Sequence, residues 1–449
     1  MISEEDEDGE PLSPMARVFQ SPGNDCCILT MIGCKTKINA DVIQHALKLN
    51  VSKHPRFSRR LSNDGACWIK TQVNVENHVF EPDIDPGEIG DNGEGYVEDY
   101  VSRLTMLHLD KSRPLWDMHI LNVKTVYAEA VCVTRSHHSL GDGTSLMSLL
   151  VVCTQNTSHR DTIPVLKRTV HKDIDIPWFL SLVLPIFWSM RLICNTFVDL
   201  LLLLATALFL KDTKTPLKGV VGVENNQKMF CHKIVSLDDI KLIKEVMNMT
   251  INDVLLGVTQ AALSRYLSNF PGKIRLIAGV CVNLRSNIGI QPLADMLAKD
   301  SKCRWGNYFS SISFPISIGL ETDPLLYLSK AQFAMNREKH SRQAALAYWI
   351  TDYIFNTFGA KVGAIFPERI VSNTTTFISN MIGPKEEISF LGHAIAYIAP
   401  SVYGHAHALT IHFLSYAEKM VISLGVDRIL LSYPNRTSFV MKWRTLSKL

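Results

Sequence analysis

The chain has 449 residues, of which 47% are hydrophobic and 20% charged, and its mean hydropathy is +0.09. This length exceeds one ordinary core, so two packed domains are expected, and the apolar balance suggests contact with lipid. A net charge of only +3 gives no reason to expect nucleic acid as a partner, and the ten scattered cysteines show no Cys-x-x-Cys pair or zinc-ligand spacing, so they are interpreted as reduced structural thiols.

The N-terminus is acidic. Residues 1–14 are polar and contain proline, so we predict a disordered leader, with order beginning near Met15. The segment lacks the basic and apolar regions of a secretory signal, so the bulk of the chain is expected to face the cytosol.

The following 140 or so residues show mixed helix and strand patterns. Apolar residues recur at helical spacing over 38–49, whereas 76–95 is rich in Pro, Gly and acid and is expected to be a loop. Helices are predicted at 96–107 and 144–152, and a β-branched strand at 127–136.

Two apolar runs come next, at 176–190 and 192–210, separated by Arg191. The second has 19 residues, close to the ~20 that span a hydrocarbon core, but Asp199 near its middle costs roughly 2.5–3.5 kcal/mol there. A spanning helix, a helix lying in the membrane and a buried interdomain helix all remain open. Lys211 and Lys214 follow it as a cytosolic flank would.

The rest of the chain again mixes helices and strands. Helices are predicted at 235–249, with Ser236 as N-cap, at 251–267 and at 325–347. Strands are predicted at 274–283, 309–318, 375–379 and 420–426.

The sharpest motif is His137-His138-Ser139-Leu140-Gly141-Asp142-Gly143, where a strand passes into a helix. Acyl transfer from a thioester to a hydroxyl needs a base, and neutral imidazole suits this role. Adjacent strand residues point to opposite sides, so we predict His138 as general base and His137 as a supporting residue. Asp142 is predicted to hold the turn, and Gly143 to allow a close backbone approach or a positive φ. No serine or cysteine nucleophile is required.

This motif resembles that of the superfamily of chloramphenicol acetyltransferase, carnitine acyltransferases and condensation domains. Further segments resemble plant bifunctional wax ester synthase/diacylglycerol acyltransferases over nearly the full length. They are PLSPMARVFQSP (11–22), RPLWDMHIL (113–121), HHSLGDGTSLMSLL (137–150), KDTKTPLKG (211–219), SLDDIKLIK (236–244), MTINDVLLGVTQAALSRYL (249–267), VNLR (282–285), WGNYFS (305–310), SNMIGP (379–384) and PSVYGHAHALTIHFLSY (400–416).

The resemblance implies an α/β fold of two similar chloramphenicol-acetyltransferase-like halves with an active-site tunnel at their interface. The halves would comprise 15–170 and 216–449, joined by the apolar segment 171–215, with a family-typical C-terminal part from about 300. Long-chain acyl-CoA and a fatty alcohol or diacylglycerol would enter from opposite mouths and meet at His138, giving wax ester or triacylglycerol without a covalent acyl-enzyme. No cofactor or metal is implied. Membrane lipid is an expected partner, with the endoplasmic reticulum as the main location and the plasma membrane as a second; no oligomeric state is predicted.

The resemblance also suggests roles near the motif. Asn307 is a candidate donor to the thioester oxyanion, with a turn-capping asparagine as the equally open alternative. Arg285 could pair with Asp142, by analogy with related two-domain acyltransferases.

Two further motifs have structural alternatives. Pro114, Leu115 and Trp116 are expected to bind substrate by lining the acyl tunnel, or else to pack between the halves. Asn252 and Asp253 lie at a helix start, where capping is favoured over a catalytic role.

Four other histidines, His393, His405, His407 and His412, invite a metal-site interpretation because His405 and His407 would share a face of a strand. No third ligand with suitable spacing follows, so core or tunnel-wall histidines are favoured.

The chain also departs from the family pattern. Met381 replaces a usual valine, the loop at 154–162 is short, and the terminal 428–449 does not resemble the usual C-terminal helix. A catalytically weak or non-catalytic lipid-binding homologue is therefore the alternative. A hydroxycinnamoyl-type acyltransferase fits less well, because the DFGWG motif is missing and the apolar runs would have no role.

Overall fold

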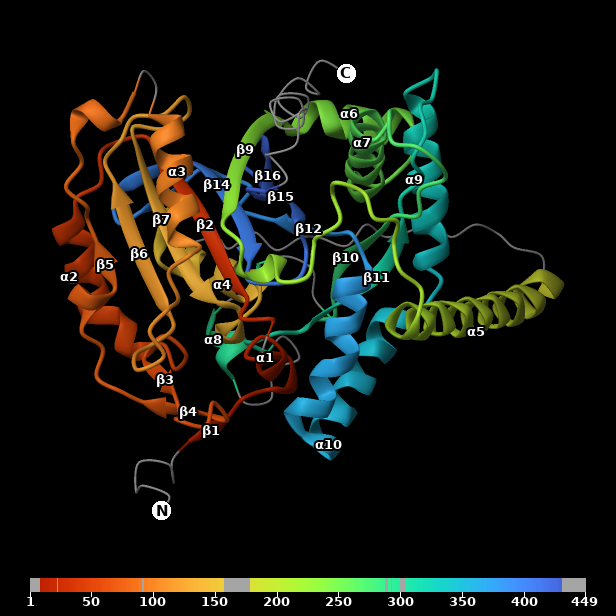
Figure 1. Ribbon diagram of the computed structural model, residues 1–449, viewed down its shortest axis with the longest axis horizontal. Helices are drawn as coiled ribbons and strands as arrows, with labels where there is room; N and C mark the ends of the chain where they lie inside the picture. Colours follow the sequence, from red (N-terminus) through yellow and green to blue (C-terminus); the bar gives the residue numbers. More distant parts are fainter. Residues whose placement is uncertain are drawn as a thin grey trace.

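The computed structural model describes residues 9–429 apart from 22, 91–92, 157–177, 287–289, 292 and 299–303. Two β-sheets stand next to each other with helices on their outer faces (Figure 1). The mixed α/β class expected from the sequence is confirmed.

The first sheet has seven strands in the order β5-β6-β7-β2-β14-β13-β8. Its core elements are β2 (Cys27–Cys34), β5 (Val79–Phe80), β6 (Trp116–Leu121), β7 (Ala130–His137), β8 (Thr154–Asn156), β13 (Ile388–Phe390) and β14 (His393–Tyr403). A small sheet of β1 (Glu10–Pro11), β4 (Cys67–Lys70) and β3 (Arg59–Leu61) lies nearby, and the helices of this half are α1 (Pro14–Val18), α2 (Ala40–Asn50), α3 (Glu94–Leu104) and α4 (Gly143–Val152).

The second sheet has six strands in the order β11-β10-β12-β15-β16-β9. They are β9 (Lys228–Ser236), β10 (Ile277–Asn283), β11 (Phe309–Pro315), β12 (Thr376–Ile382), β15 (Leu409–Tyr416) and β16 (Lys419–Asp427). The helices of this half are α5 (Trp178–Leu208), α6 (Leu237–Val246), α7 (Ile251–Tyr266), α8 (Leu293–Leu297), α9 (Leu325–Glu338) and α10 (Gln343–Asn373).

The two sheets share one stretch of chain. Strands β13 and β14 come from the segment assigned to the second half, yet β14 pairs antiparallel with β2, with Ile398 opposite Ile32. The range 216–449 therefore contributes to both sheets, and β14 also packs across β15 and β16. Because β14 belongs to the first sheet and packs on the second, it holds the two sheets against each other.

Order begins earlier than the sequence predicted. Glu10 and Pro11 form β1 by pairing with β4, and Leu12 is buried in the first core. Glu10 also forms ion pairs with Arg56 and Arg59. The predicted leader over 1–14 is thus wrong from Glu10 onward, because tertiary pairing holds a polar segment that has no local tendency to order.

One long helix predicted at 325–347 is in fact two. α9 ends at Glu338 and α10 begins at Gln343, a helix the pattern did not identify. α5 fixes the intervening turn, because Asn195 donates to the His340 carbonyl (3.2 Å) and the Arg342 N–H donates to Thr196 Oγ1 (2.9 Å). A contact distant in sequence overrides the helical periodicity here.

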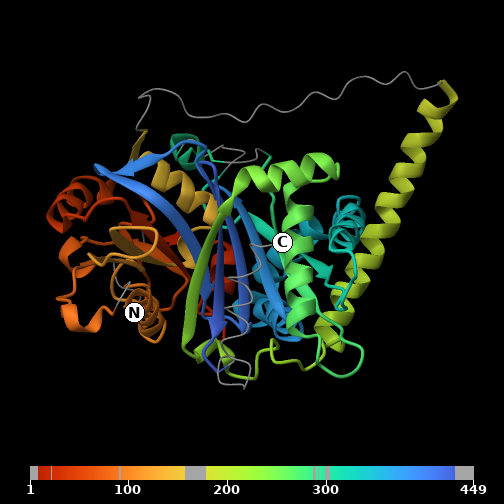
Figure 2. The same cartoon turned by 90° about the horizontal axis from the view of Figure 1, so that it is seen from above.

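The two apolar runs form one helix, α5, which lies at the outer edge of the second half (Figures 1 and 2). Its segment Val183–Leu208 is long and apolar enough to cross a membrane, by length and composition alone. Asp199 is nevertheless buried against the protein and paired with Arg337 of α9. The start of the apolar segment, most of the short loop at 154–162 and the divergent end from 430 onward lie outside the described residues.

Capping residues correctly predicted where two helices begin. Ser236 caps α6 by accepting a hydrogen bond from the Asp239 N–H (3.2 Å), as predicted. Thr250 and Asp253 form a reciprocal capping box at the start of α7, which supports the capping interpretation of Asn252-Asp253.

Candidate active site

The motif lies where β7 ends, in a single 3₁₀ turn (His138–Leu140) before α4. His138 is 8% exposed and lines a cavity between the sheets, whereas His137 points away from it and lines a separate small hollow. The predicted divergence of the two side chains is therefore what the structure shows.

Asn307 orients His138 with two hydrogen bonds. Its Nδ2 donates to the His138 carbonyl (2.9 Å), and its Oδ1 lies 3.1 Å from His138 Nδ1. A carbonyl can only accept, so the amide nitrogen must face it and the amide oxygen must face Nδ1. The proton of the neutral ring is then on Nδ1, and the lone pair is on Nε2. His138 has the tautomer that a general base requires.

Aromatic packing fixes the ring plane of His138. Phe19 stacks on it with centroids 4.1 Å apart, and Phe309 lies at 5.5 Å on a tilt. Burial lowers the pKa of His138 to about 4, so the imidazole is neutral near pH 7. In the described part of the chain Nε2 has no hydrogen-bond partner and stays available to a substrate hydroxyl.

His137 belongs to a second network. The Ser139 N–H points at its Nδ1 (3.2 Å), which places the proton on Nε2, 3.1 Å from Asp25 Oδ1. The hydrogen bond from His137 holds the pKa of Asp25 far below its usual range. Gln20 also bonds His137 Nδ1 (3.1 Å) and Ser139 Oγ (3.0 Å). These contacts anchor the turn on the side away from the cavity.

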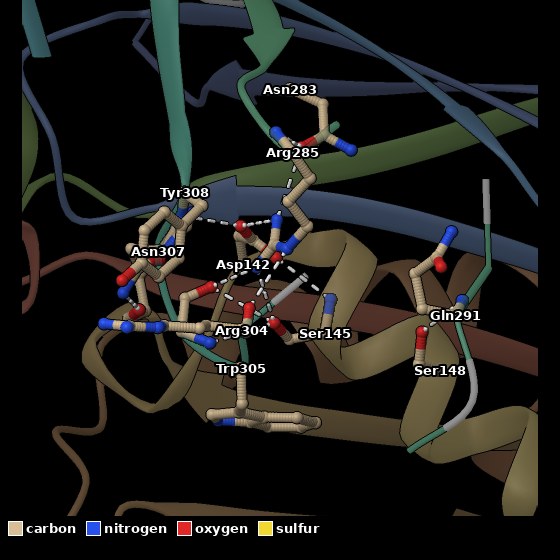
Figure 3. A network of polar contacts seen from close by, with 12 residues as sticks. Asp142, Ser145, Ser148, Asn283, Arg285, Gln291, Arg304, Trp305, Asn307 and Tyr308 are labelled. Carbon is tan, nitrogen blue, oxygen red and sulfur yellow. Dashed lines mark hydrogen bonds and ion pairs between the residues drawn. The ribbon is translucent and has the colours of Figure 1, made fainter. Parts of the chain in front are cut away.

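Asp142 and Arg285 form a buried ion pair that ties the halves together (Figure 3). Arg285 Nη1 donates to Asp142 Oδ2 (2.6 Å), and the same oxygen accepts from the Tyr308 N–H (3.0 Å). Asp142 also caps α4 through the Ser145 N–H (2.9 Å). The pair predicted by analogy is present, and the contacts of Asp142 hold the turn and the start of α4. Because Arg285 also donates to the Gly306 carbonyl (2.9 Å), the pair fixes the loop that carries Asn307.

Gly143 lies in close approach to another side chain and does not have a positive φ. A Cβ placed on it would meet the flexible end of Met381, and Gly143 is not among the residues with positive φ. The first turn of α4 therefore lies directly against β12 of the other sheet.

The cavity beside His138 has a volume of about 300 Å³ and is mainly apolar. Both sheets and α4 contribute to its walls, including Ile28, Met118, Leu146, Phe309, Phe377 and Ile398. This shape and lining suit an extended aliphatic chain whose reactive end meets His138.

The other predicted residues occupy different places. Trp116 lines the cavity and donates to the Phe57 carbonyl (3.0 Å), whereas Pro114 and Leu115 are buried in packing. Asn307 directs its amide to His138 and is absent from the cavity lining, so its contacts are those of a positioning residue rather than of an oxyanion donor.

The remaining histidines form no metal cluster. His405 and His407 lie in the turn between β14 and β15, so the expected strand placement is wrong. Within the described residues no group of three or more His, Cys, Asp or Glu is arranged to hold a metal ion.

Sequence reasoning assigned no role to Phe19, Gln20 or Asp25. Phe19 and Gln20 lie in the segment PLSPMARVFQSP (11–22), and its resemblance to the family was the one signal in the sequence that could have pointed to them. Asp25 has no local signal, because its place beside His137 depends on pairing of β2 with β7.

A neutral imidazole directed at an apolar cavity between two interlocked sheets is an arrangement that suits acyl transfer by general-base catalysis. Two family models match the chain: the wax ester synthase/diacylglycerol acyltransferase catalytic domain over residues 40–255 and the WS/DGAT C-terminal domain over residues 305–440. Wax ester synthase/diacylglycerol acyltransferase 7 of Arabidopsis thaliana is 57% identical, over 95% of this chain and 94% of its own length.

Two solved structures share the fold. The wax ester synthase/diacylglycerol acyltransferase from Marinobacter aquaeolei VT8 matches with a TM-score of 0.58 at 19% identity, covering 98% of each chain. The first condensation domain of the calcium-dependent antibiotic synthetase matches with a TM-score of 0.59 at 10% identity, covering 98% of this chain and 95% of that one. The chain belongs to the wax ester synthase/diacylglycerol acyltransferase family and is an acyl-CoA-dependent acyltransferase.

Proposed function

We propose that this protein transfers a long-chain acyl group from CoA to a fatty alcohol or a diacylglycerol, with His138 as general base. As the acceptor oxygen attacks the thioester carbonyl, His138 Nε2 takes the hydroxyl proton. When the tetrahedral intermediate collapses, the imidazolium returns that proton to the departing CoA sulfur. The acyl group passes directly to the acceptor, and no covalent acyl-enzyme forms.

The observation that carries this proposal is the orientation of His138 by Asn307 at the wall of an apolar cavity. The protonated Nδ1 keeps its hydrogen bond throughout, so the positive charge that develops on the ring is stabilised without rearrangement. The mainly apolar lining supports aliphatic substrates. The relatives are named for wax ester synthesis and diacylglycerol acylation, which supports these two acceptors.

The test uses membranes that contain the full chain, labelled palmitoyl-CoA and either hexadecanol or dioleoylglycerol. Label in the wax ester or the triacylglycerol fraction supports the proposal. Folded protein that binds palmitoyl-CoA and forms neither ester would instead indicate a non-catalytic lipid-binding protein.

We also infer that the protein works at a membrane surface of the endoplasmic reticulum, with the plasma membrane as a second location. Support comes from large exposed apolar side chains on α5, such as Ile193, Phe197 and Leu201, and on α10, such as Trp349. The burial of Asp199 beside Arg337 favours a helix that lies on the bilayer over one that crosses it alone.

Vesicle flotation tests the membrane proposal. Phe197→Ser together with Leu201→Ser should reduce the bound fraction several-fold, because both side chains are exposed on α5. Leu242→Ser is the matched control, since Leu242 is comparably exposed on α6. Equal loss of binding in the control would contradict a specific surface on α5.

A further inference from the structure

The second sheet carries a polar row that crosses its strands at one level. Register places Ser311 of β11 opposite Cys281 of β10, and Ser379 of β12 opposite His412 of β15. His412 in turn lies opposite Ser423 of β16, which lies opposite His232 of β9. The two segments join because β10 pairs in parallel with β12, with Val280 opposite Ile378, so that Cys281 and Ser379 follow side by side. Directly opposed residues share a face, so the row forms one polar stripe across the six strands.

The middle of the row faces the cavity and not the helices. The neighbours of His412 in β15, Ile411 and Phe413, pack in the core that α6, α7 and α9 cover. Cys281, Ser379 and His412 instead line the cavity that contains His138. These three residues therefore place polar groups on a cavity wall that is mainly apolar.

Several polar atoms in and beside this band have no partner in the described residues. They are His412 Nδ1, Ser423 Oγ, Ser401 Oγ and Thr410 Oγ1. Ser401 and Thr410 flank the row. Both hydroxyls lie within 3 Å of the position that a Cβ would take on Gly425, which follows Ser423 by two residues in β16. Each buried polar group left unpaired costs about 1–3 kcal/mol, so native proteins retain such groups where water or a ligand satisfies them.

His412 is suited to donate or accept a hydrogen bond without carrying charge. The ring is 5% exposed. Burial is the main cause that lowers the pKa of His412 to about 3, and the charged form of His138 would repel it further. A neutral second imidazole thus shares the cavity with the general base.

We propose that this polar row, centred on His412, binds the ester oxygens of an acylglycerol acceptor and so favours diacylglycerol over a simple fatty alcohol. A fatty alcohol has one polar atom, which must face His138. A diacylglycerol brings two ester groups beside the reacting hydroxyl, and an apolar tunnel would leave them unpaired. The proposal rests on the function proposed above and specifies its acceptor.

The first experiment measures the ratio of triacylglycerol to wax ester formed when dioleoylglycerol and hexadecanol compete for palmitoyl-CoA. His412→Leu should lower this ratio about tenfold, the equivalent of one lost hydrogen bond of about 1.4 kcal/mol. His412→Gln, which keeps polar atoms, should restore most of it. Phe413→Leu, on the same strand and the opposite face, controls for damage to β15.

A second experiment separates this inference from the proposed function. Trp116 lines the cavity, so its fluorescence reports binding of dioctanoylglycerol or tetradecanol to the His138→Ala variant without turnover. Weaker binding of dioctanoylglycerol alone after a further Ser401→Ala or His412→Leu change supports the inference even if no ester is ever formed. An unchanged product ratio in folded His412→Leu, or equal weakening for both ligands, would overturn it.

Discussion

Replacing Asn307 tests how the general base is held. Asn307→Ala removes the bond to His138 Nδ1 (3.1 Å) and the bond to its carbonyl (2.9 Å). The first bond becomes charge-assisted when the ring takes the proton, and such bonds contribute about 1.5–3 kcal/mol. Since about 1.36 kcal/mol is a factor of ten in rate, kcat should fall roughly 10- to 150-fold.

The assay is acyl transfer from palmitoyl-CoA at saturating acceptor, with KM measured alongside. KM for acyl-CoA should change little, because Asn307 does not line the cavity. Asn63→Ala is the matched control, because Asn63 is exposed and does not line the cavity. It should keep the wild-type kcat.

The pH profile of a second variant provides an independent readout. Asn307→Asp places a carboxylate beside Nδ1, which raises the pKa of His138 from its lowered value of about 4. The acid limb of kcat/KM should move to higher pH. A full kcat in Asn307→Ala, or an acid limb that stays in place in Asn307→Asp, would refute the assigned role.

Three more predictions follow from burial at the site. Asp142→Ala should lower the free energy of unfolding in urea by about 3–5 kcal/mol, because it leaves Arg285 buried without a counter-ion, and the exchange of the two charges should recover part of this loss. Burial in the folded state lowers the pKa of His138 to about 4, so the unfolded chain binds more protons than the folded chain below pH 6.5. The free energy of unfolding should therefore fall as the pH drops from 6.5 to 4, by up to about 3 kcal/mol from this residue. Gly143→Ala should shift the thermal midpoint only slightly, because the new methyl group would meet the flexible end of the Met381 side chain, which can move aside.

Much of the site could be predicted because its signals are local. The strand before the motif, the turn at Asp142 and the helix after it all follow from residue type and spacing, and they fix opposite directions for His137 and His138. The spacing of three residues between Thr250 and Asp253 likewise predicts a helix cap.

What could not be predicted depends on pairing between distant segments. The role of Asn307 is set by a carbonyl 169 residues earlier in the chain, and nothing in its neighbouring sequence shows that it faces His138. The early start of order at Glu10 has the same cause, since arginines on β3 and before it hold that residue. The end of α9 depends on side chains from α5.

The polar row illustrates the same limit within a sheet. Each member, such as Ser379 or Ser423, is an ordinary strand residue in its own segment. Only the register of β12, β15 and β16 aligns them with His412. A single sequence does not contain that register.

The most direct test of the central claim is the rate of acyl transfer by folded His138→Ala, with palmitoyl-CoA and whichever acceptor the wild type prefers. Loss of general-base catalysis should lower kcat by roughly 10²- to 10⁴-fold while palmitoyl-CoA still binds. A rate within tenfold of the wild type, in a variant with an unchanged thermal midpoint, would contradict the assignment of His138 as the base.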